Sequence, residues 1–424
     1  MRTTTDVVGK DRFGNQLSPG LPYARGSIIS NTEDDLRKLR KAWRVVEQRI
    51  NTGGADSVFN FSGLERYLPM TAEDLAVADD ELAPALYLDR FRTAALGHLG
   101  GSLHLHDAAL FNRLTAATVA THLTLVKPGD VVVGVAPTYS HPTVARAARL
   151  NGARFVDARG AEAFAEVLER EAEVALVVLT RLAATYDLLP LGEIRTVVRL
   201  AHEKGALVYA DDAGGARVGP AIFDQPRMLE LGVDVGATGL DKYGTIGPRL
   251  GLLAGEKALV ARIYARAVEL GLEARPMLYP SVVRSLEQYT PDRVRALVTS
   301  TKEVAEALRR VVGERLHETP VTAQIRAEDA LEIAMERGGL AHPPIVPIEA
   351  TAALAMLLLQ DHGMLTVHFA GLPPGNSSLL IKFIPPETLA RFGGPDAFAG
   401  AVNTSLTKLG TLLHSSDNIR RLLF

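Results

Sequence analysis

The sequence predicts an α/β protein with a mainly parallel sheet in a large domain, followed by a smaller α+β domain. From about residue 86, short β-rich runs alternate with helical stretches, as where VVVGVA (131–136) precedes PTVARAARLNG (142–152). Strands that alternate with helices of this length are typical of parallel sheets with helices on both faces. Functional side chains are then expected at the carboxyl ends of the strands.

The composition favours a globular cytoplasmic protein. The chain of 424 residues is long enough for two or three domains, and its net charge is -3. The chain therefore lacks the excess of positive charge that is typical of proteins that bind nucleic acid or an anionic membrane. There are no cysteines, which excludes disulfides and a cysteine nucleophile and fits a reducing compartment. The N-terminus has no apolar signal core, and no apolar run approaches a membrane span.

The predicted domains follow the changes in pattern. Residues 1–85 form an arm and a helical segment, in which 1–35 are extended and 34–50 have the apolar spacing of a helix. Residues 86–270 form the large domain, and 271–424 form the small one. The candidate strands of the large domain are Val131–Ala136, Arg154–Asp157, Val174–Thr180, Leu207–Asp211, Val233–Ala237 and Leu250–Leu253.

The small domain is predicted from a different rhythm. A long helical stretch (291–316) comes first, and strand-like LTVHFAG (365–371) and SLLIKF (378–383) follow around a Pro-Pro-Gly turn. A last helix is expected over 395–414. This mixture predicts an α+β fold.

Charged residues stand at the ends of neighbouring candidate strands. Asp211 and Asp212 end one strand, and Lys242 lies in the glycine-rich turn TGLDKYGTIGP (238–248) after the next. A lysine that forms a Schiff base, beside an aspartate that keeps a heterocyclic nitrogen protonated, is the minimum equipment for pyridoxal phosphate (PLP) chemistry. The alternatives are a surface lysine in a hairpin turn and a helix-capping aspartate.

Two further segments supply what such a cofactor needs. Asn112, Arg113 and Thr115 precede an alanine-rich helix start, where backbone N–H groups and the helix dipole favour a phosphate. His141 follows the strand Val131–Ala136, in a turn where its ring could stack on a pyridine. An ordinary capped helix and a surface histidine are the alternatives.

At this point the chain resembles the fold-type-I PLP enzymes, which share the aspartate aminotransferase-like fold. Within them it is most similar to the selenocysteine synthase (L-seryl-tRNA selenium transferase)-like group. The matching segments occur in the family's order, over about residues 86–260: FNRLTAAT, TYSHPTVARAARLNGARFVD, VVLTRLAATYDLLPLGEI, VYADDAGGARVG and TGLDKYGTIGPRLGLLAG.

The resemblance implies a role for each candidate residue. Lys242 would bind PLP, Asp211 would pair with the pyridine nitrogen, with Asp212 as the fallback, and His141 would stack on the ring. Asn112, Arg113 and Thr115 would line the phosphate site. The candidates for binding substrate are His98, Arg275 and Lys382. The family also implies a homodimer or higher homo-oligomer.

The predicted function is PLP-dependent chemistry on a small α-amino acid, through an external aldimine and a quinonoid. No strong basic patch precedes the cofactor domain, so a tRNA substrate is not expected. Elimination or β-replacement is one outcome. Oxygen-dependent oxidation is another, as in the monooxygenase-decarboxylases that form a carboxamide from a glycyl-nucleoside in antibiotic biosynthesis.

Two alternatives lie outside this chemistry. A non-catalytic scaffold or sensor with the same fold would need no intact Asp211/Lys242 pair. The histidines at 98, 104 and 106 include an HxH spacing that can bind metal, but no third ligand stands at a diagnostic distance, so no metal is predicted.

Overall fold

A computed structural model describes residues 9–19, 21–370 and 377–424, and the chain divides into two compact units. Residues 65–295 form one, here called the sheet unit. Residues 1–64 and 296–424 form the other, here called the helical unit. The predicted boundaries, after residues 85 and 270, differ from these. The first falls inside the helix over 82–99, which packs against the strand over 106–111, and the helix over 279–287, beyond the second, packs against the helix over 82–99.

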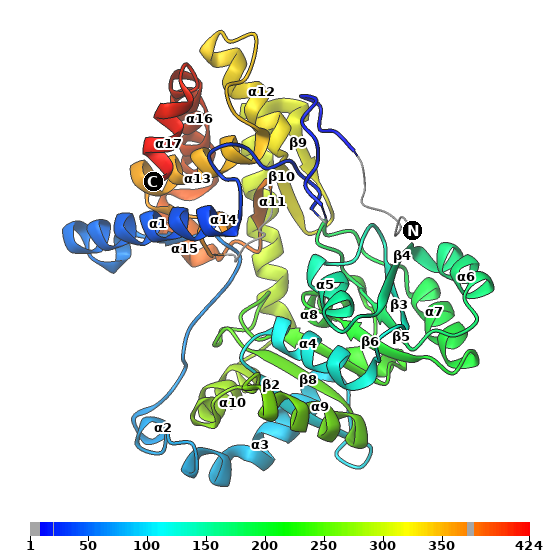
Figure 1. Ribbon diagram of the computed structural model, residues 1–424. Coiled ribbons are helices and arrows are strands. Elements are labelled where there is room, and N and C mark those ends of the chain that lie inside the picture. Colours follow the sequence, from blue (N-terminus) through cyan, green and yellow to red (C-terminus); the bar gives the residue numbers. More distant parts are fainter. Residues whose placement is uncertain (1–8, 20, 371–376) are drawn as a thin grey trace. The chain divides into compact units, whose positions relative to one another are not determined.

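The sheet unit is built on a seven-stranded sheet with the order β2-β8-β7-β6-β5-β3-β4 (Figure 1). Strand β8 runs antiparallel to both its neighbours, and all other pairings are parallel. The strands are β2 (His106–Phe111), β3 (Val131–Ala136), β4 (Arg154–Arg159), β5 (Leu176–Leu179), β6 (Leu207–Asp211), β7 (Val235–Gly239) and β8 (Gly251–Glu256). This mainly parallel sheet confirms the predicted fold class.

Helices cover both faces of the sheet, since the valine-rich central strands are apolar on both sides. One apolar core joins α4, α5 and α9 to one face, and another joins α3, α6, α7 and α10 to the opposite face. The helices of this unit are α2 (Ala72–Ala76), α3 (Leu82–Leu99), α4 (Leu114–Leu125), α5 (Pro142–Leu150), α6 (Gly160–Arg170), α7 (Leu191–Glu203), α8 (Gly215–Phe223), α9 (Lys257–Leu270) and α10 (Tyr279–Glu287).

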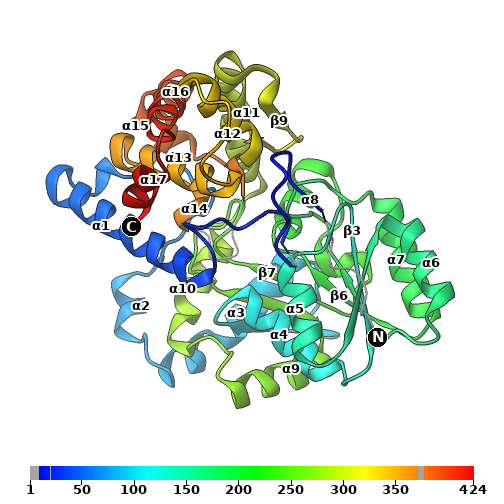
Figure 2. The same ribbon diagram turned by 45° about the horizontal axis from the view of Figure 1, so that its top comes forward.

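The helical unit is centred on α13 (Pro347–His362), in which every residue from Pro347 to Leu359 is buried. It packs against α1, α12, α16 and α17 (Figure 2). The buried carboxylate of Glu349 accepts backbone N–H bonds from Ile28 (2.7 Å) and Ile29 (2.9 Å), which fixes this part of the N-terminal arm. The helices of the unit besides α13 are α1 (Thr32–Gly53), α12 (Ala327–Gly338), α14 (Val367–Ala370), α15 (Pro386–Phe392), α16 (Gly394–Leu412) and α17 (Ser416–Leu423).

Helix α11 (Pro291–Val312) spans the boundary between the units. The strands of the helical unit are short. An antiparallel sheet joins β9 (Leu316–Glu318), β10 (Thr322–Ile325) and β12 (Leu379–Lys382), and β1 (Phe59–Asn60) pairs in parallel with β11 (Met364–Leu365). Among the described residues, no helix is long and apolar enough to cross a membrane.

The predicted elements agree with the structure in order, and most strand ends shift by a few residues. Strand β2 was not predicted, because its first half is polar (His106, Asp107). The segment LTVHFAG was predicted as a strand, but its Val367–Ala370 part is the helix α14. The predicted Pro-Pro-Gly turn lies outside the described residues.

Candidate active site

The sheet brings Asp211 and Lys242 to one edge. Asp211 is the last residue of β6 and pairs in register with Ala237 of β7, and Lys242 stands in the turn that follows β7. Because β6 and β7 are parallel neighbours, both residues lie at the carboxyl ends of their strands. The charge of Lys242 acts on the Asp211 carboxyl, so the two groups lie near each other.

The turn that holds Lys242 has an uncommon backbone. Tyr243 has φ 49° and Gly244 has φ 96°, both in the left-handed region, which a tyrosine rarely adopts. The Thr245 hydroxyl donates to the Lys242 carbonyl (2.9 Å) and closes the turn. Burial lowers the pKa of the Lys242 amine, and the charges of Asp241 and Asp211 oppose that change. A lowered pKa suits an amine that must react as a neutral nucleophile.

The two aspartates of the doublet differ in their partners. Asp212 forms a fully buried ion pair with Arg181, whose Nε donates to Asp212 Oδ1 at 3.1 Å. Asp211 is also buried, yet its carboxylate accepts no hydrogen bond from the described residues. Burial raises the pKa of Asp211 to about 6, and the charge of Lys242 limits the rise. Asp211 therefore keeps its carboxylate available, whereas Asp212 is held by an arginine.

His141 lies near Lys242, since the charge of Lys242 acts on its ring. It is the N-cap of α5, and its Nδ1 accepts the backbone N–H of Thr143 at 3.2 Å. The residue is exposed at the surface, although the protein around its ring lowers its pKa to about 4, and the positive charges of Lys242 and Arg146 act in the same direction. A neutral ring at pH 7 suits stacking on a cationic heterocycle.

Three arginines lie within range of the Asp241 charge beside Lys242, and they are here called the arginine cluster: Arg66, Arg113 and Arg249. Asp241 is buried and accepts a bond from Arg66 Nε at 2.8 Å. Burial lowers the pKa of Arg249 to about 10 and also lowers the pKa of Arg113. The charge of Arg66 contributes to both shifts, whereas that of Asp241 opposes them. Arg66 and Arg249 are half-buried, and Arg113 is exposed.

The arginine cluster includes the N-terminus of α4. Arg113 is the N-cap of α4 and makes no side-chain cap bond, so the first N–H groups of the helix remain available for an anion. Gly251 of β8 allows close packing here, since a Cβ at this position would lie 2.7 Å from the Arg113 carbonyl. Thr115 is half-buried in the first turn, whereas the Asn112 amide donates to the Gly271 carbonyl at 3.1 Å.

The predicted substrate-binding residues lie in different surroundings. Arg275 is exposed and pairs with Asp80. Lys382 belongs to the helical unit, where it is buried against Gly63. The His98 ring packs edge-on against Tyr289 with 4.5 Å between ring centroids, and its buried Nε2 has no hydrogen-bond partner among the described residues.

Several residues of this region were missed in the sequence. Arg66 and Arg249 of the arginine cluster, the Asp212 partner Arg181, and the buried Arg217 stand near the cofactor residues only after folding. The signal for Arg249 was its position, directly after the glycine-rich turn that holds Lys242. At the end of β5, the Thr180 hydroxyl is likewise buried without a partner among the described residues.

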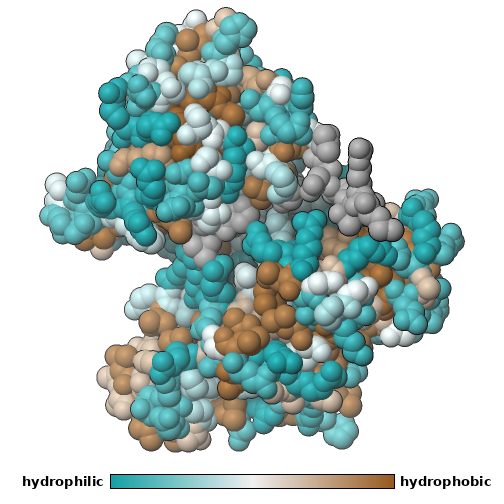
Figure 3. Space-filling model, in the orientation of Figure 1, coloured by the Kyte–Doolittle hydropathy of each residue, from teal (hydrophilic) through white to brown (hydrophobic). Residues whose placement is uncertain are grey.

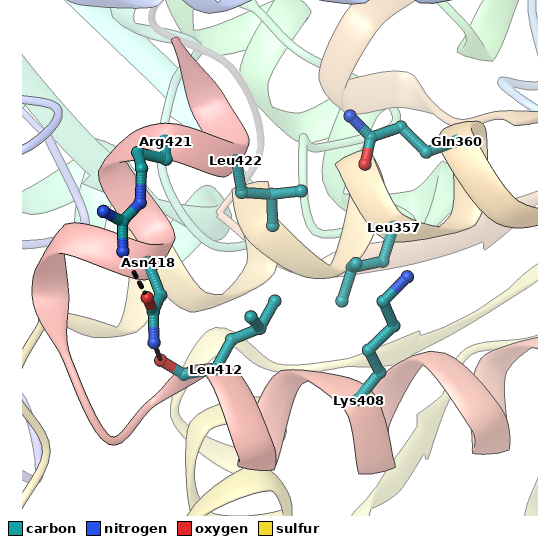
Figure 4. Close-up of a pocket in the computed structure, with 7 residues that line it drawn as sticks. All are labelled: Leu357, Gln360, Lys408, Leu412, Asn418, Arg421 and Leu422. Carbon is teal, nitrogen blue, oxygen red and sulfur yellow. Dashed lines mark hydrogen bonds between the residues drawn. The ribbon is translucent and has the colours of Figure 1, made fainter.

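The helical unit contains a pocket of different character, with a volume of about 340 Å³ (Figure 4). In it, Lys408 pairs with Asp361 at 2.7 Å, and Arg421 donates to the side-chain oxygen of Asn418 at 2.7 Å. The residues that line this helical pocket are Leu357, Gln360, Lys408, Leu412, Asn418, Arg421 and Leu422.

A phosphorylated pyridine aldehyde fits the residues at the strand ends. The arginine cluster has one carboxylate for three guanidinium groups, and it adjoins the unoccupied N–H groups of α4, as a phosphate requires. Lys242 supplies an amine of lowered pKa, and Asp211 supplies a buried carboxylate. Fold and site together define a fold-type-I PLP-dependent enzyme.

Comparison with known proteins identifies the family. The chain is 31% identical over 353 residues to a UPF0425 pyridoxal phosphate-dependent protein of Methanothermobacter thermautotrophicus, with 83% of this chain and 88% of the relative covered. It is 28% identical to the protein of the same description from Methanosphaera stadtmanae, over 83% and 89% of the two chains. The chain belongs to the UPF0425 family of pyridoxal phosphate-dependent proteins. The predicted cofactor is thereby confirmed at the level of the family. No family model matches the chain.

Solved structures agree with the fold. An α-aminoadipate aminotransferase from Thermus thermophilus, complexed with N-(5'-phosphopyridoxyl)-L-leucine, has a TM-score of 0.52 and 17% identity, over 87% of this chain and 98% of that one. A chain of the SepCysS–SepCysE N-terminal domain complex has a TM-score of 0.57 and 14% identity, over 83% and 95%. At this identity the likeness shows the fold alone.

Proposed function

We propose that this protein is a PLP-dependent enzyme that eliminates or replaces a β-substituent of a small α-amino acid. The observation that carries the proposal is the convergence of Lys242, Asp211 and His141 beside the arginine cluster. Asp211 ends β6, Lys242 follows β7 and His141 lies between β3 and α5, and the charge of Lys242 acts on the other two residues.

Each residue has a role that its surroundings support. When bound, PLP supplies an electron sink for the bond broken at the substrate Cα. Asp211 keeps the ring nitrogen protonated, because an ionised carboxylate stabilises a neighbouring cation in a buried site. Lys242, released as an amine, takes the proton from Cα, since burial lowers its pKa. The arginine cluster would hold the phosphate, and neutral His141 would lie against the ring.

The subgroup and the assembly belong to the proposal as well. We infer a member of the selenocysteine synthase-like group that acts on free amino acids, supported by the segment order around Asp211 and Lys242. A homo-oligomer is supported by exposed apolar side chains in one stretch of the sheet unit. Figure 3 shows hydrophobic surface where α2 lies, at the lower left. These side chains are Tyr67, Leu68, Leu75, Leu82 and Leu86.

The experiment begins with the cofactor attachment. PLP-loaded protein is reduced with borohydride and digested, and the peptides are weighed by mass spectrometry. We expect the added mass on the peptide that contains Lys242, its absence in Lys242→Ala, and its retention in Lys127→Ala, which removes an exposed lysine of the same unit. Attachment at another lysine would refute the assignment.

The reaction is tested on the same loaded protein. Amino acids with a leaving group on Cβ are supplied while ammonia, keto acid and dissolved oxygen are measured. Release of ammonia and keto acid without oxygen uptake supports elimination. Oxygen uptake in proportion to product would contradict elimination and support the monooxygenase-decarboxylase alternative. The absence of both reactions would support the non-catalytic scaffold alternative.

A further inference from the structure

Arg217 is a buried cation next to the end of β7, just before the turn that holds Lys242. It lies on α8, directly after the aspartate doublet, and its side chain is fully buried. Its Nη1 donates to the Gly239 carbonyl (2.8 Å) and to the Thr238 hydroxyl (3.1 Å), at the end of β7. These bonds fix the guanidinium close to Lys242, whose pKa is lowered by the Arg217 charge in addition to burial.

The opposite edge of this guanidinium is free. Nε and Nη2 of Arg217 are buried and have no hydrogen-bond partner among the described residues. These two N–H groups form the fork that binds a carboxylate through two parallel bonds. Another arginine of this protein binds a carboxylate in this way, since Nε and Nη2 of Arg181 donate to the two oxygens of Asp212. Buried donors without an acceptor are strongly disfavoured, so an acceptor is expected here.

The carboxylates near Arg217 are paired with other arginines. Asp212 is bound by Arg181, and Asp241 is bound by Arg66. Both act on Arg217 only through their charge, and burial lowers the Arg217 pKa to about 10. Arg217 thus stays positively charged at pH 7 with no carboxylate of its own. An anion would supply both the acceptor and the opposite charge that the described residues do not give this edge of Arg217.

His98 and Tyr289 belong to the same surroundings. The charge of Arg217 acts on both rings, which pack edge-on against each other. Burial and the Arg217 charge keep the pKa of His98 well below its usual value, so this ring is neutral. In the tautomer with its hydrogen on Nε2, the otherwise unpartnered nitrogen is a further donor for an anion.

We propose that Arg217 forms a carboxylate subsite beside Lys242, and that this subsite takes the α-carboxylate of the amino-acid substrate. The inference rests on the proposed function for the identity of the substrate, but the anion subsite itself stands on the free edge of Arg217. A carboxylate held by two bonds to a buried guanidinium is stabilised as an anion, which disfavours its loss as carbon dioxide. The subsite therefore favours reactions that retain the carboxylate.

The test compares two ligands and two variants. PLP-loaded protein is titrated with L-alanine and with ethylamine, which lacks the carboxylate, and the absorbance of the cofactor reports binding. Arg217→Lys keeps a positive charge and a donor for Gly239 but loses the fork. Arg262→Gln removes an exposed arginine of α9 and serves as the matched control.

We expect Arg217→Lys to weaken alanine binding by about 10- to 100-fold, the loss typical of charged hydrogen bonds, with ethylamine binding unchanged. Arg262→Gln should change neither. Equal effects on both ligands, or no effect on either, would overturn the proposal.

A second experiment uses acetate as the ligand and does not depend on PLP. It should raise the melting temperature of wild-type apoprotein and raise it less in Arg217→Lys. Acetate binding without any preference for alanine over ethylamine would show that the subsite takes free carboxylates only, which overturns its role for the substrate. If Lys242 proves not to carry PLP, the acetate arm still decides whether Arg217 binds a carboxylate. An equal rise in both proteins would refute the subsite.

Discussion

The strand-end site and the helical pocket both contain cationic side chains, but they differ in how the charges are balanced. In the helical pocket, Lys408 is exposed and paired with Asp361, and Arg421 is exposed and bonded to Asn418. At the strand ends, the arginine cluster shares one carboxylate, and Arg217 keeps two buried donors without partners among the described residues. Buried donors without a partner therefore distinguish the strand ends from the helical pocket, and they are the basis for the proposed site.

The largest expected difference is in stability, between the loss of a buried ion pair and the loss of an exposed one. Arg181→Met leaves Asp212 buried and unpaired, which should lower the free energy of unfolding of the apoprotein by about 3–5 kcal/mol. Lys408→Met, which removes the exposed partner of Asp361, should change it by less than about 1 kcal/mol. Denaturant titration measures both. Similar losses in the two variants would show that burial does not separate these pairs.

The next effect depends on pH. Asp211 has a pKa of about 6 in the folded protein against an ordinary value of 3.8, so the folded state binds its proton more tightly than the unfolded state. Its ionisation therefore destabilises the folded apoprotein as the pH rises from about 4 to 6, by up to about 3 kcal/mol above that range.

Asp211→Asn removes this titration. Its stability advantage over wild type should be smallest near pH 4, grow with pH, and reach a plateau above pH 6, as thermal unfolding across this range will measure. A difference that stays flat with pH would refute the perturbed carboxyl. Saturating PLP should reduce the advantage, because the ring nitrogen then pairs with the ionised carboxylate.

A smaller effect separates the arginine cluster from the arginine of the helical pocket. Arg249→Met removes one charged donor from the proposed phosphate site, so the affinity for PLP should fall about 10- to 100-fold. Arg421→Met should leave it unchanged. Fluorescence titration of the apoprotein with PLP measures both affinities, and an equal loss in the two variants would contradict a phosphate site at the arginine cluster.

Much of the fold could be predicted from the sequence because its signals are local. The strands β3 and β6 are short apolar runs between helical patterns, and a parallel sheet places their ends together. Strand β2 escaped because His106 and Asp107 interrupt the apolar pattern. Helix α14 escaped because Val367, His368 and Phe369 suit a strand as well as a helix.

The sequence pattern alone indicated proximity only where neighbours in the sheet are also close in sequence, and the family resemblance added distant residues such as His141 and Arg113. Asp211 and Lys242 follow consecutive strands, so their proximity could be inferred. Arg66 and Asp241 come together across a long stretch of chain, and only folding shows that the charge of this carboxylate also acts on Arg113 and Arg249. The partners of Asp212 and Arg217 are likewise invisible to local patterns.

The unbalanced arginine cluster has a consequence for handling the protein. A site with three guanidinium groups and one carboxylate attracts any small oxyanion, not only its own cofactor. Phosphate or sulfate in a purification buffer should therefore compete with PLP at α4 and slow its loading. Protein purified in such buffers should contain less PLP, and therefore absorb less visible light, than protein purified in chloride alone.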